Sequence, residues 1–273
     1  MTRRIVLHIG SPKCGSTYLQ RVMLKNASVL TEHGVRYPDP GDGHPGNAGA
    51  LPEVSRAEID GWFADGVETV VLSHEDLFSK ARTAQRLMKI AGKTGTEVQV
   101  IAFLRPFSDF LFGDYSQFMK QHFPRYLASR NPYDGRSFRD LIVRRVDKLN
   151  AARFLTNWQR IAGDAPIRVA GHREIKPVVE ELIGALPLDW SVERHETNPS
   201  LRMEDCDRIA AALRRPHVPN SVIEQMYHAA FFKVDRPDSG RNAARRAVIE
   251  EMFAEENAQI LEAFGYDNRL KPD

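Results

Sequence analysis

The fold of this chain is decided by residues 7–20, which read LHIGSPKCGSTYLQ. An apolar run ends there in a turn rich in glycine, serine and threonine, and the turn leads into a helix pattern. The backbone amides of such a turn point at one spot, where the helix dipole adds about half a positive charge. Lys13 supplies a full charge. The stretch therefore predicts a cradle for a phosphate-bearing ligand.

The position of the lysine separates this loop from the loop that binds nucleoside triphosphates. That loop reads G-x-x-x-x-G-K-[ST], with the lysine directly after the second glycine. Gly10 and Gly15 keep the spacing, but Ser16 and Thr17 follow Gly15 and the lysine lies at position 13. We therefore expect Lys13 to reach different phosphate oxygens, and the sequence offers no obvious carboxylate nearby for a magnesium ion.

A second motif ends another apolar run. Residues 97–104 form a mostly apolar strand pattern that ends at Arg105, and Pro106 stops the strand and favours the start of a helix. Residues 107–121 read as that helix. We therefore expect Arg105 at the carboxyl end of a strand.

Runs rich in β-branched residues, with helix-compatible sequence between them, determine the predicted fold class. They are residues 5–9, 69–72, 98–104 and 167–170. The alternation predicts an α/β protein, a three-layer α/β/α arrangement with a central parallel sheet, a P-loop-like nucleotide-binding core and a helical C-terminal part. Ligands of such sheets bind beyond the carboxyl ends of the strands, where both motifs fall.

The whole chain, residues 1–273, is expected to form a single domain with a helical elaboration over residues 200–273. Residues 37–49 are rich in proline and glycine and predict an irregular loop. Residues 137–161 read as one amphipathic helix. The tail from residue 201 reads as mostly helical, with breaks at residues 216–219 and 235–240.

Composition narrows the function class. The formal net charge of +2, without a basic block interleaved with aromatic residues, argues against nucleic-acid binding. The arginine-rich segments 136–145 and 241–246 read as solvated helix faces, and the second is also a candidate for anion binding.

Cys14 and Cys206 cannot build a disulfide scaffold, and no residue cluster suggests zinc, so we expect no metal site and a reducing, cytoplasmic location. The first apolar run is too short for a signal peptide or a membrane span.

The first motif resembles the 5′-phosphosulfate loop of the sulfotransferases that use 3′-phosphoadenosine 5′-phosphosulfate (PAPS). That pattern is close to x-P-K-[TCS]-G-[ST]-[TS]. The residues that match it, and that the resemblance assigns to donor binding, are Pro12, Lys13, Cys14, Gly15, Ser16 and Thr17. The resemblance also implies that Lys13 neutralises the bridging oxygen as the bond to sulfur breaks.

The second motif resembles the family's 3′-phosphate site. An arginine at this strand end, often followed by proline, binds the 3′-phosphate in sulfotransferases, and Arg105 fits it. A serine eight residues later usually shares the contact in an S-x-Y-x-Q pattern, whereas this chain has Gly113 there. The resemblance therefore assigns Arg105 and the Gly113 position to the donor, with an amide, a water or Ser116 as candidates to replace the hydroxyl.

Further segments are similar to bacterial, carbohydrate-type members of the family. They are residues 70–75, 197–201 and 253–257. The resemblance implies transfer of a sulfuryl group to a hydroxyl or amine of an acceptor, with adenosine 3′,5′-bisphosphate (PAP) as product and no metal requirement. Carbohydrate, lipid, phenol and small-metabolite acceptors all remain open.

The acceptor must lose its proton to a base, for which we retain three candidates. His74 follows a strand end and resembles the serine-histidine or threonine-histidine pair of cytosolic sulfotransferases. Glu75 corresponds to the glutamate of carbohydrate-type members. His44, in the loop of residues 37–49, is the third, since family members often carry a histidine in this region.

Two other functions remain open at this point. A P-loop kinase of small molecules would share the fold and the cradle, and its magnesium dependence would distinguish it. A nucleotide-binding protein without catalytic activity is the other alternative, and the replacement of the usual serine by Gly113 is the feature that favours it.

Overall fold

The computed structural model describes residues 3–41, 43–146, 148–193 and 197–271. It is an α/β structure built on a five-stranded sheet whose pairings are all parallel, as predicted. The described chain divides into two compact units. The first comprises Met1–Arg105, Ala151–Asn198 and Ala258–Asn268, and the second comprises Pro106–Asn150, Pro199–Asn257 and Arg269–Asp273.

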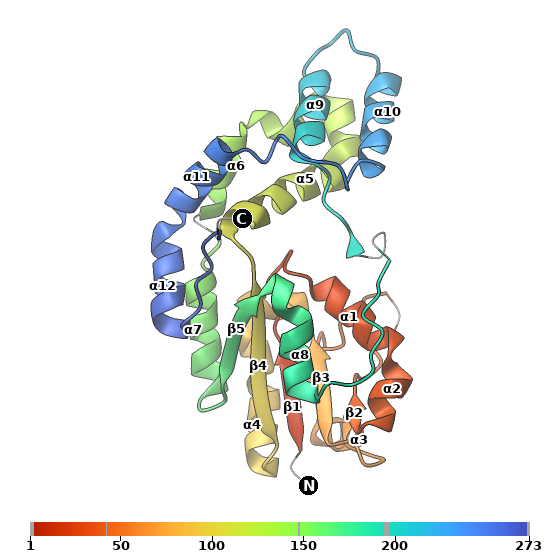
Figure 1. Cartoon of the computed structure of the whole chain (residues 1–273), viewed down its shortest axis with the longest axis vertical. Helices are drawn as coiled ribbons and strands as arrows, with labels where there is room; N and C mark the ends of the chain where they lie inside the picture. The colour runs from red at the N-terminus through yellow and green to blue at the C-terminus, as the bar shows by residue number, and fades with distance from the viewer. Residues whose placement is uncertain (1–2, 42, 147, 194–196, 272–273) are drawn as a thin grey trace. The chain divides into compact units, whose positions relative to one another are not determined.

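The sheet belongs to the first unit and has the strand order β2-β3-β1-β4-β5. Its strands are β1 (Arg4–His8), β2 (Val35–Arg36), β3 (Thr69–Ser73), β4 (Glu97–Leu104) and β5 (Ile167–Gly171). Figure 1 shows β1 between β3 and β4. The chain turns to opposite sides of β1 for β3 and for β4, so the segments that follow these three strands meet at a topological switch point.

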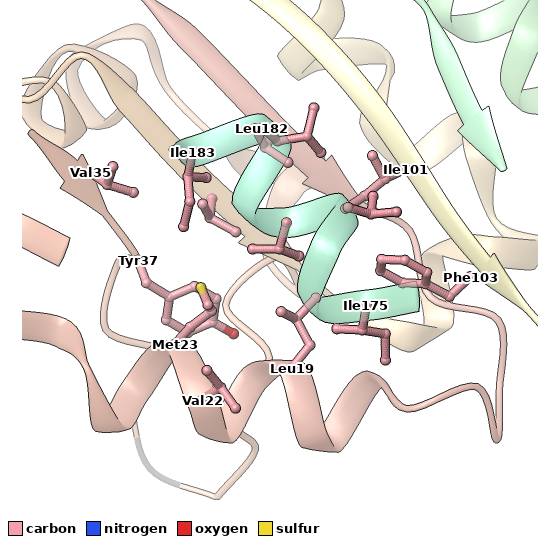
Figure 2. Close-up of a cluster of buried hydrophobic side chains, with 14 of the residues drawn as sticks. Leu19, Val22, Met23, Val35, Tyr37, Ile101, Phe103, Ile175, Leu182 and Ile183 are labelled. Atoms are coloured by element: carbon pink, nitrogen blue, oxygen red, sulfur yellow. The ribbon is translucent and has the colours of Figure 1, made fainter. Parts of the chain in front are cut away.

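Helices cover both faces of the sheet because both faces are apolar. Three helices share one buried cluster with the strands: α1 (Ser16–Lys25), α2 (Ala27–Glu32) and α8 (Ile175–Ile183). Figure 2 shows Ile175 of α8 beside Phe103 of β4, and Leu19 and Val22 of α1 belong to the same buried cluster. This cluster fixes the start of α1 against the sheet.

The alternate strand residues, such as Leu7 and Leu72, are fully buried on the opposite face. The helices α4 (Gln85–Thr94) and α7 (Ala151–Ala162) contact β4 and β5 respectively. The remaining short elements of this unit are α3 (Arg56–Trp62) and the 3-10 helices η1 (Leu51–Glu53), η2 (Glu75–Ser79), η3 (Ala81–Ala84) and η5 (His172–Glu174). Figure 1 shows α8 in front of the sheet and α4 behind it.

The second unit is helical. Its elements are α5 (Phe107–Ser129), η4 (Pro132–Gly135), α6 (Phe138–Val146), α9 (Met203–Leu213), α10 (Asn220–Phe231) and α11 (Ala243–Met252), while α12 (Ala254–Phe264) begins here and ends in the first unit. The long helix α5 packs against α9 and α11. The helical tail and its two breaks confirm the sequence prediction.

The prediction of one helix over residues 137–161 is wrong. The structure has α6 and α7 there, and residues 148–150 between them are not helical. Arg145, in the last turn of α6, donates a hydrogen bond of 2.8 Å from Nη2 to Oδ1 of the buried Asp114. The segment of α6 packs in the second unit and that of α7 in the first. The two segments therefore form separate helices, although their apolar residues follow one helical period.

Candidate functional site

The loop between β1 and α1 has an unusual backbone. Gly10, Ser11, Lys13 and Gly15 have φ angles of 81°, 139°, 62° and 91°, a region that residues other than glycine rarely adopt. The amide of Cys14 closes the turn on the carbonyl of Ser11 at 3.3 Å. Alternating left-handed residues of this kind turn backbone amides toward one concave surface, which suits an anion.

Two close contacts require glycine in this loop. A Cβ atom at Gly10 would lie 2.5 Å from Cα of Glu75, and one at Gly15 would lie 2.5 Å from Cδ1 of Ile175. The loop therefore packs tightly at both ends: Gly10 contacts the segment that follows β3, and Gly15 contacts α8. The first contact places the backbone of Glu75 directly beside the loop.

The start of α1 offers polar groups without a protein cap. Gly15 is the N-cap residue and no side chain caps the first turn, which begins at Ser16 and Thr17. The hydroxyl of Ser16 is buried and has no hydrogen-bond partner among the described residues. A buried hydroxyl next to uncapped helical amides fits an anionic oxygen, because both would otherwise remain unsatisfied.

Arg105 lies against the loop. Its Nη1 donates a hydrogen bond of 2.7 Å to the carbonyl oxygen of Lys13, across 92 positions of sequence. The guanidinium thereby holds the one loop residue that carries both a left-handed backbone and a cationic side chain. Arg105 and Lys13 thus bring two positive charges to one place, each on a half-buried residue.

The other predicted loop residues differ in exposure. Pro12 is exposed and Thr17 is half-buried, whereas Cys14 is buried. Burial raises the pKa of the Cys14 thiol to about 11, and a hydrogen bond with Ser11 and the charge of Arg105 oppose the rise only in part. Cys14 is therefore a neutral thiol under the loop, and its part in the cradle is that of its backbone.

A buried polar network joins the carboxyl ends of β1 and β3 to α1, and the sequence analysis did not predict it. His8, the last residue of β1, is fully buried, and its Nδ1 lies 2.8 Å from Oγ of Ser73 at the end of β3. Gln20 of α1 donates to the same hydroxyl at 3.0 Å. Burial lowers the pKa of His8 to about 3, so the ring is neutral. The only sequence signal was a polar residue at the end of an otherwise apolar run.

The described residues of the loop 37–49, which are all but residue 42, are irregular, as predicted, and Asn47 attaches the loop to β3. The side chain of Asn47 accepts a hydrogen bond from the amide of Ser73 at 2.8 Å and donates to the carbonyl of Val71 at 3.1 Å. Gly46 packs so closely that a Cβ atom there would lie 2.8 Å from the carbonyl oxygen of Ser73. These contacts bring His44 to the carboxyl end of β3.

His44 and His74 form a stacked pair, with ring centroids 4.7 Å apart and 25° between the ring planes. His74 is half-buried and His44 is exposed. Burial lowers the pKa of His74, and the neighbouring His44 lowers it further, while Asp76 and Glu75 act in the opposite direction. The three candidate bases named from sequence are therefore neighbours in the structure.

The predicted donor residue Gly113 belongs to the second unit, within α5, where it is buried. Ser116, named as a replacement for the usual serine, accepts a hydrogen bond of 2.7 Å from the amide of Leu201. The hydroxyl of Ser116 therefore anchors the segment before α9. The assignment of the Gly113 position to the donor stays a prediction.

The arginines of segment 241–246 bind carboxylates of the second unit. Arg246 donates to Asp109 at 3.1 Å, and Arg245 donates to Asp207 at 2.8 Å. The carboxylate of Asp109 is almost fully buried on α5. These pairs give the arginines a structural role that the sequence pattern had not distinguished from a solvated face.

Among the described residues no group of histidine, cysteine and acidic side chains is arranged to hold a metal ion. Within the same residues, no helix combines the length and the apolar character needed to cross a bilayer.

No family model and no curated protein matches the chain. The chain is similar to the crystal structure of a sulfotransferase from Alicyclobacillus acidocaldarius, with 13% identity, 98% of each chain covered and a TM-score of 0.49.

Proposed function

We propose that this chain is a sulfotransferase that moves a sulfuryl group from PAPS to a hydroxyl or amine of an acceptor, with a carbohydrate as the acceptor class that its sequence motifs favour. The observation that carries the proposal is the start of α1, where the Ser16 hydroxyl is buried without a partner among the described residues. Lys13 and Arg105 add positive charge at the same loop. The Ser16 hydroxyl, the loop amides and Lys13 fit the 5′-phosphosulfate of the donor, and Arg105 lies beside them for its 3′-phosphate.

Bound PAPS would supply an activated sulfuryl group whose bridging oxygen gains negative charge as its bond to sulfur breaks. Lys13 and the amides of the loop stabilise that charge because they are already oriented before the reaction begins. The guanidinium of Arg105 holds the backbone of Lys13 through its carbonyl. In this proposal the same guanidinium would also bind the 3′-phosphate. The transfer resembles phosphoryl transfer, in which positioning and charge stabilisation contribute most of the catalysis.

The position of the lysine supports sulfuryl transfer over the kinase alternative. Lys13 lies within the turn at φ 62° and not at the start of the helix. The acceptor side is formed by His44, His74 and Glu75, which lie at or against the segment after β3.

We further propose a cytoplasmic location, since both cysteines are buried free thiols.

Turnover of PAPS in the presence of a metal chelator tests the proposal. We expect PAP and sulfated product, or sulfate when water is the acceptor, without added metal. Lys13→Ala should lower turnover by about 100-fold or more, the scale of one lost electrostatic stabiliser. Lys89→Ala, which removes the same charge from an exposed position on α4, should leave turnover unchanged.

Three outcomes would contradict the proposal in different ways. Magnesium-dependent turnover of ATP without turnover of PAPS would favour the kinase. Tight binding of PAP without transfer to water or to any acceptor in a panel of sugars, phenols and amines would favour the non-catalytic alternative. Equal turnover in Lys13→Ala and Lys89→Ala would remove Lys13 from the mechanism.

A further inference from the structure

The two stacked histidines are held by backbone amides on the same ring atom. The amide of Gly46 donates to Nδ1 of His44 at 2.9 Å, and the amide of Asp76 donates to Nδ1 of His74 at 3.2 Å. A backbone amide can only donate, so Nδ1 of each ring must accept and carries no proton. A neutral imidazole has one ring proton, which therefore lies on Nε2 in both histidines.

This tautomer has a chemical consequence. A histidine that removes a proton at Nε2 needs a lone pair there and a proton on Nδ1. Both rings have the reverse arrangement, so each presents an N–H donor at Nε2. Taking the other tautomer would oppose two N–H groups at each Nδ1 and break the contacts that position the rings. His44 and His74 are thus built to donate hydrogen bonds.

The surroundings of the pair favour the neutral state. His74 is packed against His44, and a second positive ring at a centroid distance of 4.7 Å would be repelled. The charged groups that act on His74 are Glu75, Asp76 and Lys80, together with His44. Asp76 forms an ion pair with Lys80, at 2.9 Å from Oδ2 to Nζ. Of the two carboxylates near His74, Glu75 is therefore the one that has no ion pair with a described residue.

The backbone of Glu75 also contacts the donor loop. Its backbone touches Gly10 so closely that a methyl group at Gly10 would overlap with it. It follows His74 directly at the carboxyl end of β3 and begins η2. The Glu75 side chain therefore starts from a backbone position beside the loop that would hold the sulfuryl donor, and its charge acts on His74.

We propose that His44 and His74 bind an oxygen-bearing group of the acceptor as paired N–H donors, and that Glu75 is the base. The proposal rests on the sulfotransferase function. The acceptor hydroxyl gives its proton to the Glu75 carboxylate, and its oxygen forms the new bond to sulfur. The electron pair of the broken sulfur–oxygen bond stays on the 5′-phosphate of PAP.

The tautomers can be tested on the free protein. Nitrogen-15 NMR of the imidazole rings, with His44→Gln and His74→Gln used for assignment, distinguishes Nε2–H from Nδ1–H. We expect Nε2–H for both rings in their neutral form. A proton on Nδ1 of either ring would overturn the proposal. This result does not depend on any ligand, so it is separate from the failure of PAPS binding or turnover.

Variants then separate the donor role from the base role. His74→Asn keeps an acceptor for the Asp76 amide, and His74→Gln keeps a donor near the position of Nε2, but neither is basic. With PAPS as probe and water as acceptor, Glu75→Gln should lower turnover by about 100-fold, the scale for loss of a general base, and His74→Gln by less than about tenfold. His74→Gln should also keep the pH profile of the unmodified protein. The opposite ranking, with the acidic limb of the profile lost in His74→Gln, would make His74 the base.

Discussion

Gly10→Ala tests whether the loop geometry depends on the contact between Gly10 and Glu75. The φ angle of 81° costs a residue with a Cβ atom about 1–2 kcal/mol. The added methyl group would lie 2.5 Å from Cα and 2.9 Å from the carbonyl oxygen of Glu75, which are backbone atoms. Forcing them apart should cost a further ~1–3 kcal/mol, the usual scale of overpacking. We therefore expect a total of about 2–5 kcal/mol.

Gly66→Ala is the matched control. Gly66 has the same φ of 81°, but nothing lies within 4 Å of the Cβ position. Its cost should be about 1–2 kcal/mol, and the effect of alanine on the unfolded chain cancels between the two variants. The free energy of unfolding in urea and the affinity for PAP by calorimetry should be measured for both. Equal stability and unchanged PAP affinity in both variants would refute the contact between the loop and Glu75.

Four other changes have defined outcomes. Lys13→Met should weaken PAP binding at low salt and lose most of that effect at high salt, because only a charge is removed; a salt-independent loss would point to misfolding. Arg105→Ala should abolish the preference for PAP over adenosine 5′-monophosphate, and an unchanged preference would remove Arg105 from the 3′-phosphate site. Gly113→Ser should tighten PAP binding, whereas unchanged affinity would mean that another group already fills this place. Burial lowers the pKa of His8 to about 3, whereas its value in the unfolded chain is near 6.5. Between these values the unfolded chain binds one more proton, so the free energy of unfolding should fall as the pH drops, by at most about 1.4 kcal/mol per pH unit. His8→Asn should lack this part of the pH dependence in urea titrations at pH 4 to 7, and an identical slope would contradict the assignment.

The features that sequence predicted well are local ones. The carboxyl ends of β1, β3 and β4 follow from apolar runs that end at polar residues, and the start of α1 follows from its glycines and hydroxyls. Parallel strands place these ends at one edge, which was sufficient to bring Lys13, Arg105 and Glu75 into one unit. The two-residue strand β2 was missed because so short a run has no period.

The features that sequence did not predict depend on contacts between distant positions. Arg105 reaches Lys13 across 92 positions, and His8 reaches Ser73 across 65. The tautomers of His44 and His74 depend on the conformation of backbone two residues further along the chain, which no residue type dictates. The pair of Arg145 with Asp114 joins α6 to α5 across 31 positions. Patterns of one segment contain no information on such pairings.

The most direct measurement of the central claim is calorimetric titration of the purified, folded protein with PAP, with adenosine 5′-monophosphate as the comparison. The loop at the start of α1, with Lys13, Ser16 and Arg105, predicts binding of PAP without metal and weaker binding of the monophosphate. Absence of heat from PAP at millimolar concentration, in a protein shown to be folded, would contradict the proposed function.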